Sequence, residues 1–136
     1  MVESYQPDGM IMPSLYTIEQ SYREMSGNRI AALIRLNPDH EIFRGHYPGN
    51  PVLPGVCIIQ ILKELLRYHS GGDLVLENLD SAKYYSAINP VQNSLLNFSI
   101  ELVETDCNGT AFKAEIYFES VVYCRVRGSY TVSAPC

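Results

Sequence analysis

The sequence lacks three features that would each point to a class of protein: a long apolar segment, a basic run, and closely spaced cysteines. No stretch approaches the run of about 20 apolar residues that crosses a membrane, so we expect no membrane protein. The ten Lys and Arg residues are scattered among 15 Asp and Glu residues, and the net charge is −5. Because no basic run can neutralise phosphates, we exclude nucleic-acid binding. Docking of an acidic protein would need a basic patch, and the sequence alone does not gather the cations on one face.

The chain also has little that would mark export or metal binding. Residues 1–9 are polar and do not resemble a signal peptide. Its four cysteines show no CxxC or CxxH spacing; they are Cys57, Cys107, Cys124 and Cys136. Cys57 follows an apolar pattern and Cys124 a strand-like one, so both are expected to be small core residues. We therefore expect a cytoplasmic protein with neither a disulfide framework nor a metal site.

What the sequence does contain is the pattern of one small α+β domain that spans residues 1–136. One segment predicts a helix, which starts near Pro54 and stops at Ser70-Gly71-Gly72. Its apolar residues cover most of its circumference, so a sheet must surround it. Strand-like patterns occupy residues 29–36, 74–87, 94–104, 111–119 and 121–132, and Asn108-Gly109 predicts a hairpin between the third and fourth. The sequence thus predicts a curved antiparallel sheet wrapped around one buried helix.

The most unusual stretch runs from His40 to Gln60, where two glycine–proline clusters precede the helix. His46 lies between turn-forming residues, and Pro54-Gly55 begins the helix. The first N–H groups of a helix have no intrahelical partner and can polarise a carbonyl oxygen. A histidine beside them is a candidate general base, so His46 is a candidate catalytic residue. By contrast, His40 and His69 are expected to be solvated.

The segment "FRGHYPGNPVLPGVCII" resembles the signature of the β-hydroxyacyl-acyl-carrier-protein dehydratases, in which G-H-F-P-G-x-P precedes P-G-V. "NLDSAKYYSAINP" is similar to the third strand of that family. The resemblance implies the hot-dog fold, a dimer with sites at its interface, and a 3-hydroxyacyl chain on acyl carrier protein as the substrate. It assigns the base to His46 and the thioester-binding N–H to Gly55. The implied chemistry needs no cofactor and no metal.

At the position where the family carries its catalytic glutamate, this chain has Gln60. An amide has no titratable proton and cannot act as general acid or base, which typically lowers the rate by about 10² to 10⁴. Glu64 lies one turn further along the same helix face, so we hypothesise that it supplies the missing carboxylate. The alternative is that Glu64 is a solvated or structurally paired residue.

Three functions are therefore open. The first is a dehydratase, a lyase acting on acyl thioesters in fatty-acid or related lipid or polyketide synthesis. The second is a non-catalytic acyl-binding subunit or heterodimer partner, and the third is an acyl thioesterase. The substrate tunnel is expected to be apolar, with Tyr16, Tyr84 and Tyr85 as possible linings. The alternative is that these tyrosines are packing residues of strands.

Overall fold

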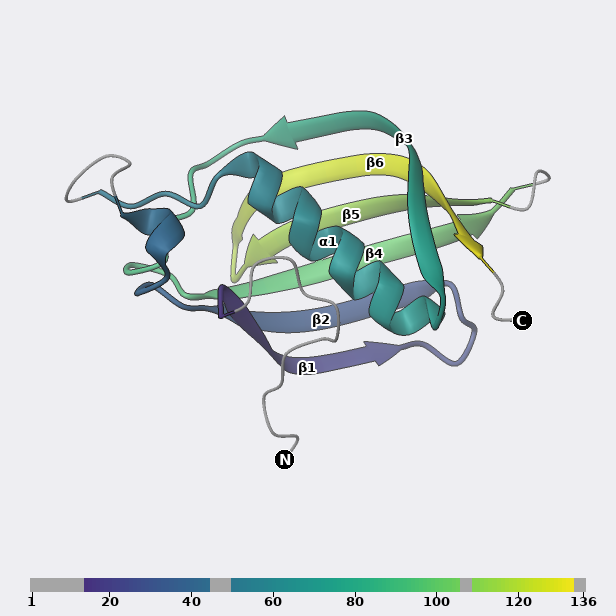
Figure 1. Cartoon of the computed structure of the whole chain (residues 1–136), viewed down its shortest axis with the longest axis horizontal. Helices are drawn as coiled ribbons and strands as arrows, with labels where there is room; N and C mark the ends of the chain where they lie inside the picture. Colours follow the sequence, from purple (N-terminus) through teal and green to yellow (C-terminus); the bar gives the residue numbers. More distant parts are fainter. Residues whose placement is uncertain (1–13, 45–49, 106–108, 134–136) are drawn as a thin grey trace.

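The computed structural model describes residues 14–44, 50–105 and 109–133, which form one antiparallel sheet with a long helix against it (Figure 1). His46 and Asn108 lie outside the described residues. The sheet has six strands in the order β1-β2-β4-β5-β6-β3. Its elements are β1 (Tyr16–Arg23), β2 (Arg29–Leu36), a short 3-10 helix (Glu41–Phe43), α1 (Gly55–Ser70), β3 (Asp73–Tyr84), β4 (Leu95–Glu104), β5 (Thr110–Phe118) and β6 (Val121–Ser133).

The predicted α+β arrangement is confirmed, because the strands curve around α1 (Figure 1). In β2 and β4 the buried side chains alternate with side chains that face away from the helix, as expected for a half-buried sheet. The core side chains of both strands are apolar; they are Ile30, Ala32, Ile34, Leu36, Leu96, Phe98, Ile100 and Leu102. The sheet therefore supplies the cover that the apolar helix requires.

The ends of α1 agree with the sequence prediction. Pro54 is the residue that precedes the first helical residue, Gly55, and it has an extended backbone. Gly71 ends the helix in the left-handed conformation with φ 75°, and its N–H donates to the carbonyl oxygen of Arg67. A residue without a side chain adopts this conformation at little cost, which explains why the helix stops there.

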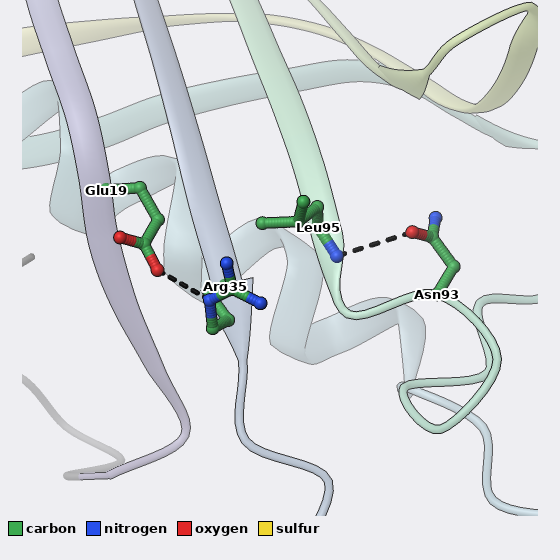
Figure 2. A network of polar contacts seen from close by, with 4 residues as sticks. All are labelled: Glu19, Arg35, Asn93 and Leu95. Atoms are coloured by element: carbon green, nitrogen blue, oxygen red, sulfur yellow. Dashed lines mark hydrogen bonds and ion pairs between the residues drawn. The ribbon is translucent and has the colours of Figure 1, made fainter.

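The first strand, β1, was not predicted from the sequence. Only its first half shows a clear apolar alternation, with Tyr16 and Ile18 buried. A bulge at Glu19 shifts the register between β1 and β2 and hides the period of two. Figure 2 shows the ion pair that joins the two strands beside this bulge, in which the Arg35 guanidinium lies 2.6 Å from the Glu19 carboxylate. The same view shows Asn93 accepting a hydrogen bond from the N–H of Leu95 at the start of β4.

Two histidines are less solvated than the sequence predicted. The ring of His40 accepts a hydrogen bond from the N–H of Ile42 and so caps the short 3-10 helix. His69 is half-buried and forms a hydrogen bond with the Ser21 hydroxyl, which ties the end of α1 to β1. Burial, together with the nearby charge of Arg23, lowers the pKa of His69. The prediction for His69 was wrong because its partner Ser21 lies 48 positions away and leaves no local signal. The prediction for His40 was wrong because its ring makes a local contact, with a backbone N–H two positions along the chain.

The outer face of the sheet, away from α1, gathers cations that the sequence alone could not place together. A hollow of about 270 Å³ there is lined by four of the ten Lys and Arg residues and by only two carboxylates. We call the residues that line this hollow the basic face. Its charged residues are Arg29, Lys113, Arg125, Arg127, Glu101 and Glu115. Lys113 and Arg127 are direct cross-strand partners, an arrangement of like charges that costs stability.

Candidate active site

The N-terminus of α1 forms one half of the candidate site. The N–H groups of Gly55 and Val56 make no hydrogen bond to any residue in the described part of the chain. Leu53 anchors the loop before the helix. Its side chain is buried, and its N–H donates to the carbonyl oxygen of Ile88 at 2.9 Å. Two amide donors are thus presented at the positive end of the helix dipole, where they can bind a carbonyl oxygen.

A mostly apolar pocket of about 420 Å³ lies beside this helix end. Its lining is contributed by the loop before α1, the first turn of α1, and the segment that follows β3; it comprises Val52, Leu53, Gly55, Ile58, Tyr84, Tyr85, Ser86, Ala87 and Ile88. Of the three tyrosines proposed as tunnel linings, Tyr84 and Tyr85 therefore do line a pocket. An apolar pocket that ends at polarising N–H groups suits an acyl thioester.

Tyr84 explains why the first helical residue is a glycine. Its hydroxyl donates to the carbonyl oxygen of Gly55 at 3.2 Å. A Cβ on residue 55 would lie only 2.7 Å from the Tyr84 ring. A larger residue at position 55 would thus force the exposed Tyr84 ring to move, and glycine lets the ring lie over the helix end.

The predicted residues Gln60 and Glu64 come together as expected, on one face of α1. The Gln60 amide nitrogen donates to one oxygen of Glu64 at 3.0 Å. The other oxygen of Glu64 accepts from the hydroxyl of Tyr16 on β1 at 2.8 Å. Glu64 is only 6% exposed and Tyr16 only 1%, so this carboxylate is structurally paired and buried rather than solvated. Tyr16 is a core residue bound to Glu64, which agrees with the alternative that it is a packing residue of the sheet.

The two halves of the candidate site face different sides of α1. Gly55 and Gln60 are five residues apart, which places them about 140° apart around the helix axis. Gly55 meets Tyr84 at the end of β3, whereas Gln60 is connected through Glu64 to Tyr16 on β1. Since β1 and β3 are the opposite edges of the sheet, Gly55 and Gln60 are tied to different parts of the fold and do not form one site within one chain.

The two described cysteines, Cys57 and Cys124, offer no reactive nucleophile. Both are buried, as predicted. Burial raises the pKa of Cys57, and it raises the pKa of Cys124 to about 11. A thiol with a raised pKa stays protonated at neutral pH and is a poor nucleophile. Within the described residues no cluster of three or more His, Cys, Asp and Glu side chains is placed to hold a metal ion, and no helix is long and apolar enough to span a membrane.

Sequence reasoning missed the role of Tyr16, which is 48 positions away from its partner Glu64. No periodicity connects residues so far apart. The available signal was indirect: Glu64 is the one polar residue on the otherwise apolar buried face of α1, and a buried carboxylate requires hydrogen-bond donors from elsewhere in the fold.

Known proteins resemble this chain in both sequence and fold. The family model described as ApeI dehydratase matches residues 22–122. A 3-hydroxyacyl-[acyl-carrier-protein] dehydratase of Lactobacillus helveticus is 28% identical over 116 residues, which cover 80% of this chain and 77% of the relative. Among solved structures, the dehydratase heterocomplex ApeI:P from Xenorhabdus doucetiae superposes with a TM-score of 0.63 at 18% identity, covering 82% of this chain and 96% of that one.

A hypothetical thioesterase of Streptococcus pneumoniae, solved with coenzyme A, has nearly the same similarity, with a TM-score of 0.62 at 18% identity; the match covers 87% of this chain and 85% of that one. These likenesses confirm the predicted hot-dog fold, and at such identities they establish the fold alone. The family assignment comes instead from the sequence match, which covers most of the chain. The chain belongs to the ApeI-like dehydratase family.

Proposed function

We propose that this protein is a dehydratase that removes water from a 3-hydroxyacyl thioester carried on an acyl carrier protein. The observation that carries the proposal is the mostly apolar pocket lined by Gly55 at the start of α1, whose N–H, like that of Val56, has no acceptor within the described part of the chain. Such donors stabilise the negative charge that develops on a thioester oxygen when the α-proton leaves. The family match and the dehydratases among its relatives support the same chemistry.

In the proposed reaction His46 removes the proton from C2, and the N–H of Gly55 holds the thioester oxygen. The double bond forms between C2 and C3 as the C3–O bond breaks, and the hydroxyl leaves as water. Gln60 accepts a hydrogen bond from the 3-hydroxyl but cannot supply the proton that water needs. The imidazolium of His46, which carries the abstracted proton, is the group of this site that can return it.

The contacts of Glu64 favour a positioning role over proton transfer. Both of its oxygens accept hydrogen bonds within the chain, from Tyr16 and from Gln60, and its side chain is almost completely buried. A group that exchanges protons with a substrate must reach it to within hydrogen-bond distance. We therefore assign Glu64 to the support of Gln60 rather than to the missing acid.

The active form is proposed to be a dimer whose two sites are shared. Gly55 and Gln60 point to different sides of α1, so a complete site needs Gln60 from a second subunit. The edge strand β3 offers a surface for pairing, because in the described sheet it is bonded on one side only and exposes Val75 and Leu79. A related heterodimer, in which the partner supplies a carboxylate at this position, is the second candidate and is favoured by Gln60 itself.

The carrier is proposed to dock across the basic face. Arg125 connects this face to the pocket, since its guanidinium lies 5.5 Å from the centre of the Tyr85 ring and Tyr85 lines the pocket. Four cations against two carboxylates, on a chain of net charge −5, form the kind of surface that attracts an acidic carrier.

The decisive experiment incubates the purified protein with a 3-hydroxyacyl thioester and follows the products by mass spectrometry. Dehydration predicts the 2-enoyl thioester, and the reverse reaction should hydrate an added enoyl thioester. The His46→Ala variant serves as the control and should be inactive. Release of free acid would identify a thioesterase, and binding without turnover would identify a non-catalytic subunit.

A further inference from the structure

Glu64 is the one charged residue that is buried among those that the structure describes. An isolated carboxylate inside a protein is strongly unfavourable, so its donors determine whether the fold tolerates it. The two donors come from different elements: the phenol of Tyr16 on β1 and the amide of Gln60 on α1. This chain of three side chains therefore crosses the helix–sheet interface and ends at the residue that replaces the family glutamate.

The direction of every hydrogen bond in this chain is fixed by chemistry. An ionised carboxylate only accepts, so the Gln60 amide must turn its nitrogen towards Glu64 and its carbonyl oxygen away. An amide alone could adopt either of two orientations that differ by a flip, and only its partners distinguish them. Burial and the charge of Glu64 raise the pKa of Tyr16, so its phenol keeps its proton and remains a donor.

Gln60 still has hydrogen-bonding capacity to offer. It is half-buried, and in the described ranges neither its carbonyl oxygen nor its second amide hydrogen has a partner. The oxygen that points away from Glu64 is thus available to a group approaching from outside the chain.

We propose that Tyr16 and Glu64 are positioning residues that lock the Gln60 amide so that its carbonyl oxygen accepts a hydrogen bond from the 3-hydroxyl of the bound acyl chain. The inference rests on the proposed function and makes it more specific. The site thus recognises a hydroxylated acyl chain through the carbonyl oxygen of Gln60. At the same position, the glutamate that the resemblance implies for the family would act through its carboxyl group.

Glu64→Gln reverses this polarity while preserving size. The phenol of Tyr16 still donates, so the carbonyl oxygen of the new glutamine turns towards Tyr16 and its nitrogen towards residue 60. Gln60 must then flip to offer its oxygen to that nitrogen, and its own N–H groups turn outwards. Tyr16→Phe removes the hydroxyl that donates to Glu64. This variant should therefore loosen the orientation of the Gln60 amide without reversing it.

The test compares the binding of two N-acetylcysteamine thioesters of equal chain length, one with a 3-hydroxyl and one saturated. All variants carry His46→Ala so that the hydroxylated ligand is not consumed, and Glu19→Gln, on the outer face, is the matched control. We expect the parent to prefer the hydroxylated ligand by roughly five- to tenfold. Glu64→Gln should abolish this preference, Tyr16→Phe should reduce it, and Glu19→Gln should leave it unchanged.

The affinity for the saturated ligand should stay constant in all variants, which separates a polarity effect from a general loss of structure. If Glu64→Gln retains the preference for the hydroxylated ligand, the inference is overturned. This holds even if the wild-type protein, which keeps His46, dehydrates its substrate. Equal losses for both ligands would also overturn it, because they would assign Glu64 a purely structural role. Absence of both turnover and binding would refute the proposed function, and the inference with it.

Discussion

Residue 60 separates this chain from the chemistry that its family motif implies, and the effect of Gln60 depends on Glu64. A second carboxylate introduced by Gln60→Glu would lie about as close to Glu64 as the present 3.0 Å contact. Two carboxylates at that distance cannot both ionise readily, so the pair would hold a proton with a raised pKa.

Gln60→Glu is therefore expected to destabilise the fold in a pH-dependent manner. The folded variant retains a proton that the unfolded chain releases above about pH 4, so stability should fall as pH rises. We expect a loss of roughly 2 kcal/mol at pH 8 that shrinks towards pH 5. Thermal unfolding of the variant and the wild type across this range measures the effect, and a pH-independent loss would contradict the assigned contact.

The double variant, Gln60→Glu combined with Glu64→Gln, creates the order of residues that the resemblance to the dehydratases implies. The new amide at position 64 can accept from Tyr16 and donate to the new carboxylate at position 60, so the exchange keeps all three side chains connected. We expect a dehydration rate on the order of 10² higher than that of the wild type, because a titratable acid is regained. Rates with the same 3-hydroxyacyl thioester test this; a double variant slower than the wild type would contradict the assignment of position 60.

Among the elements, the central helix and the strands β2 to β6 could be predicted, and β1 could not. The helix has a strong period and ends at Gly71, and β4 and β5 alternate cleanly between apolar and polar residues. In β1 the bulge at Glu19 interrupts the alternation. The candidate site shows a similar limit: local motifs led to the prediction of Gly55 and Gln60 as site residues, but nothing local linked Tyr16 to Glu64.

The contact between α1 and β1 at His69 should make the fold sensitive to acid. Burial lowers the pKa of His69 in the folded state, and Arg23 lowers it further, so the unfolded chain binds this proton first as pH falls. Stability should therefore be lost as pH falls below the ordinary value of 6.5. His69→Gln keeps a partner for Ser21 without a titrating ring, so its melting temperature should drop less between pH 7.5 and 5.5. An identical drop in both proteins would refute this role.

At the scale of the whole molecule, the uneven charge distribution predicts how the carrier binds. If the basic face attracts an acidic carrier, the KM for the carrier-bound substrate should rise steeply with salt. The KM for a small thioester surrogate should change little. Lys113→Glu combined with Arg127→Glu should raise the KM for the carrier-bound substrate about tenfold and leave the KM for the small surrogate unchanged. Equal changes in both KM values would exclude docking on this face.

The central claim is that each site combines Gly55 and its pocket from one subunit with Gln60 from another. Mixed dimers test it most directly: a His46→Ala chain lacks the base, and a Gln60→Trp chain blocks the site with a bulky side chain, so each is expected to be inactive alone. The two chains are co-expressed with different tags or refolded together. Random pairing places one intact site in every heterodimer, so about a quarter of the wild-type activity should return. If the wild type dehydrates a 3-hydroxyacyl thioester but the mixture stays as inactive as its components, the shared site is contradicted.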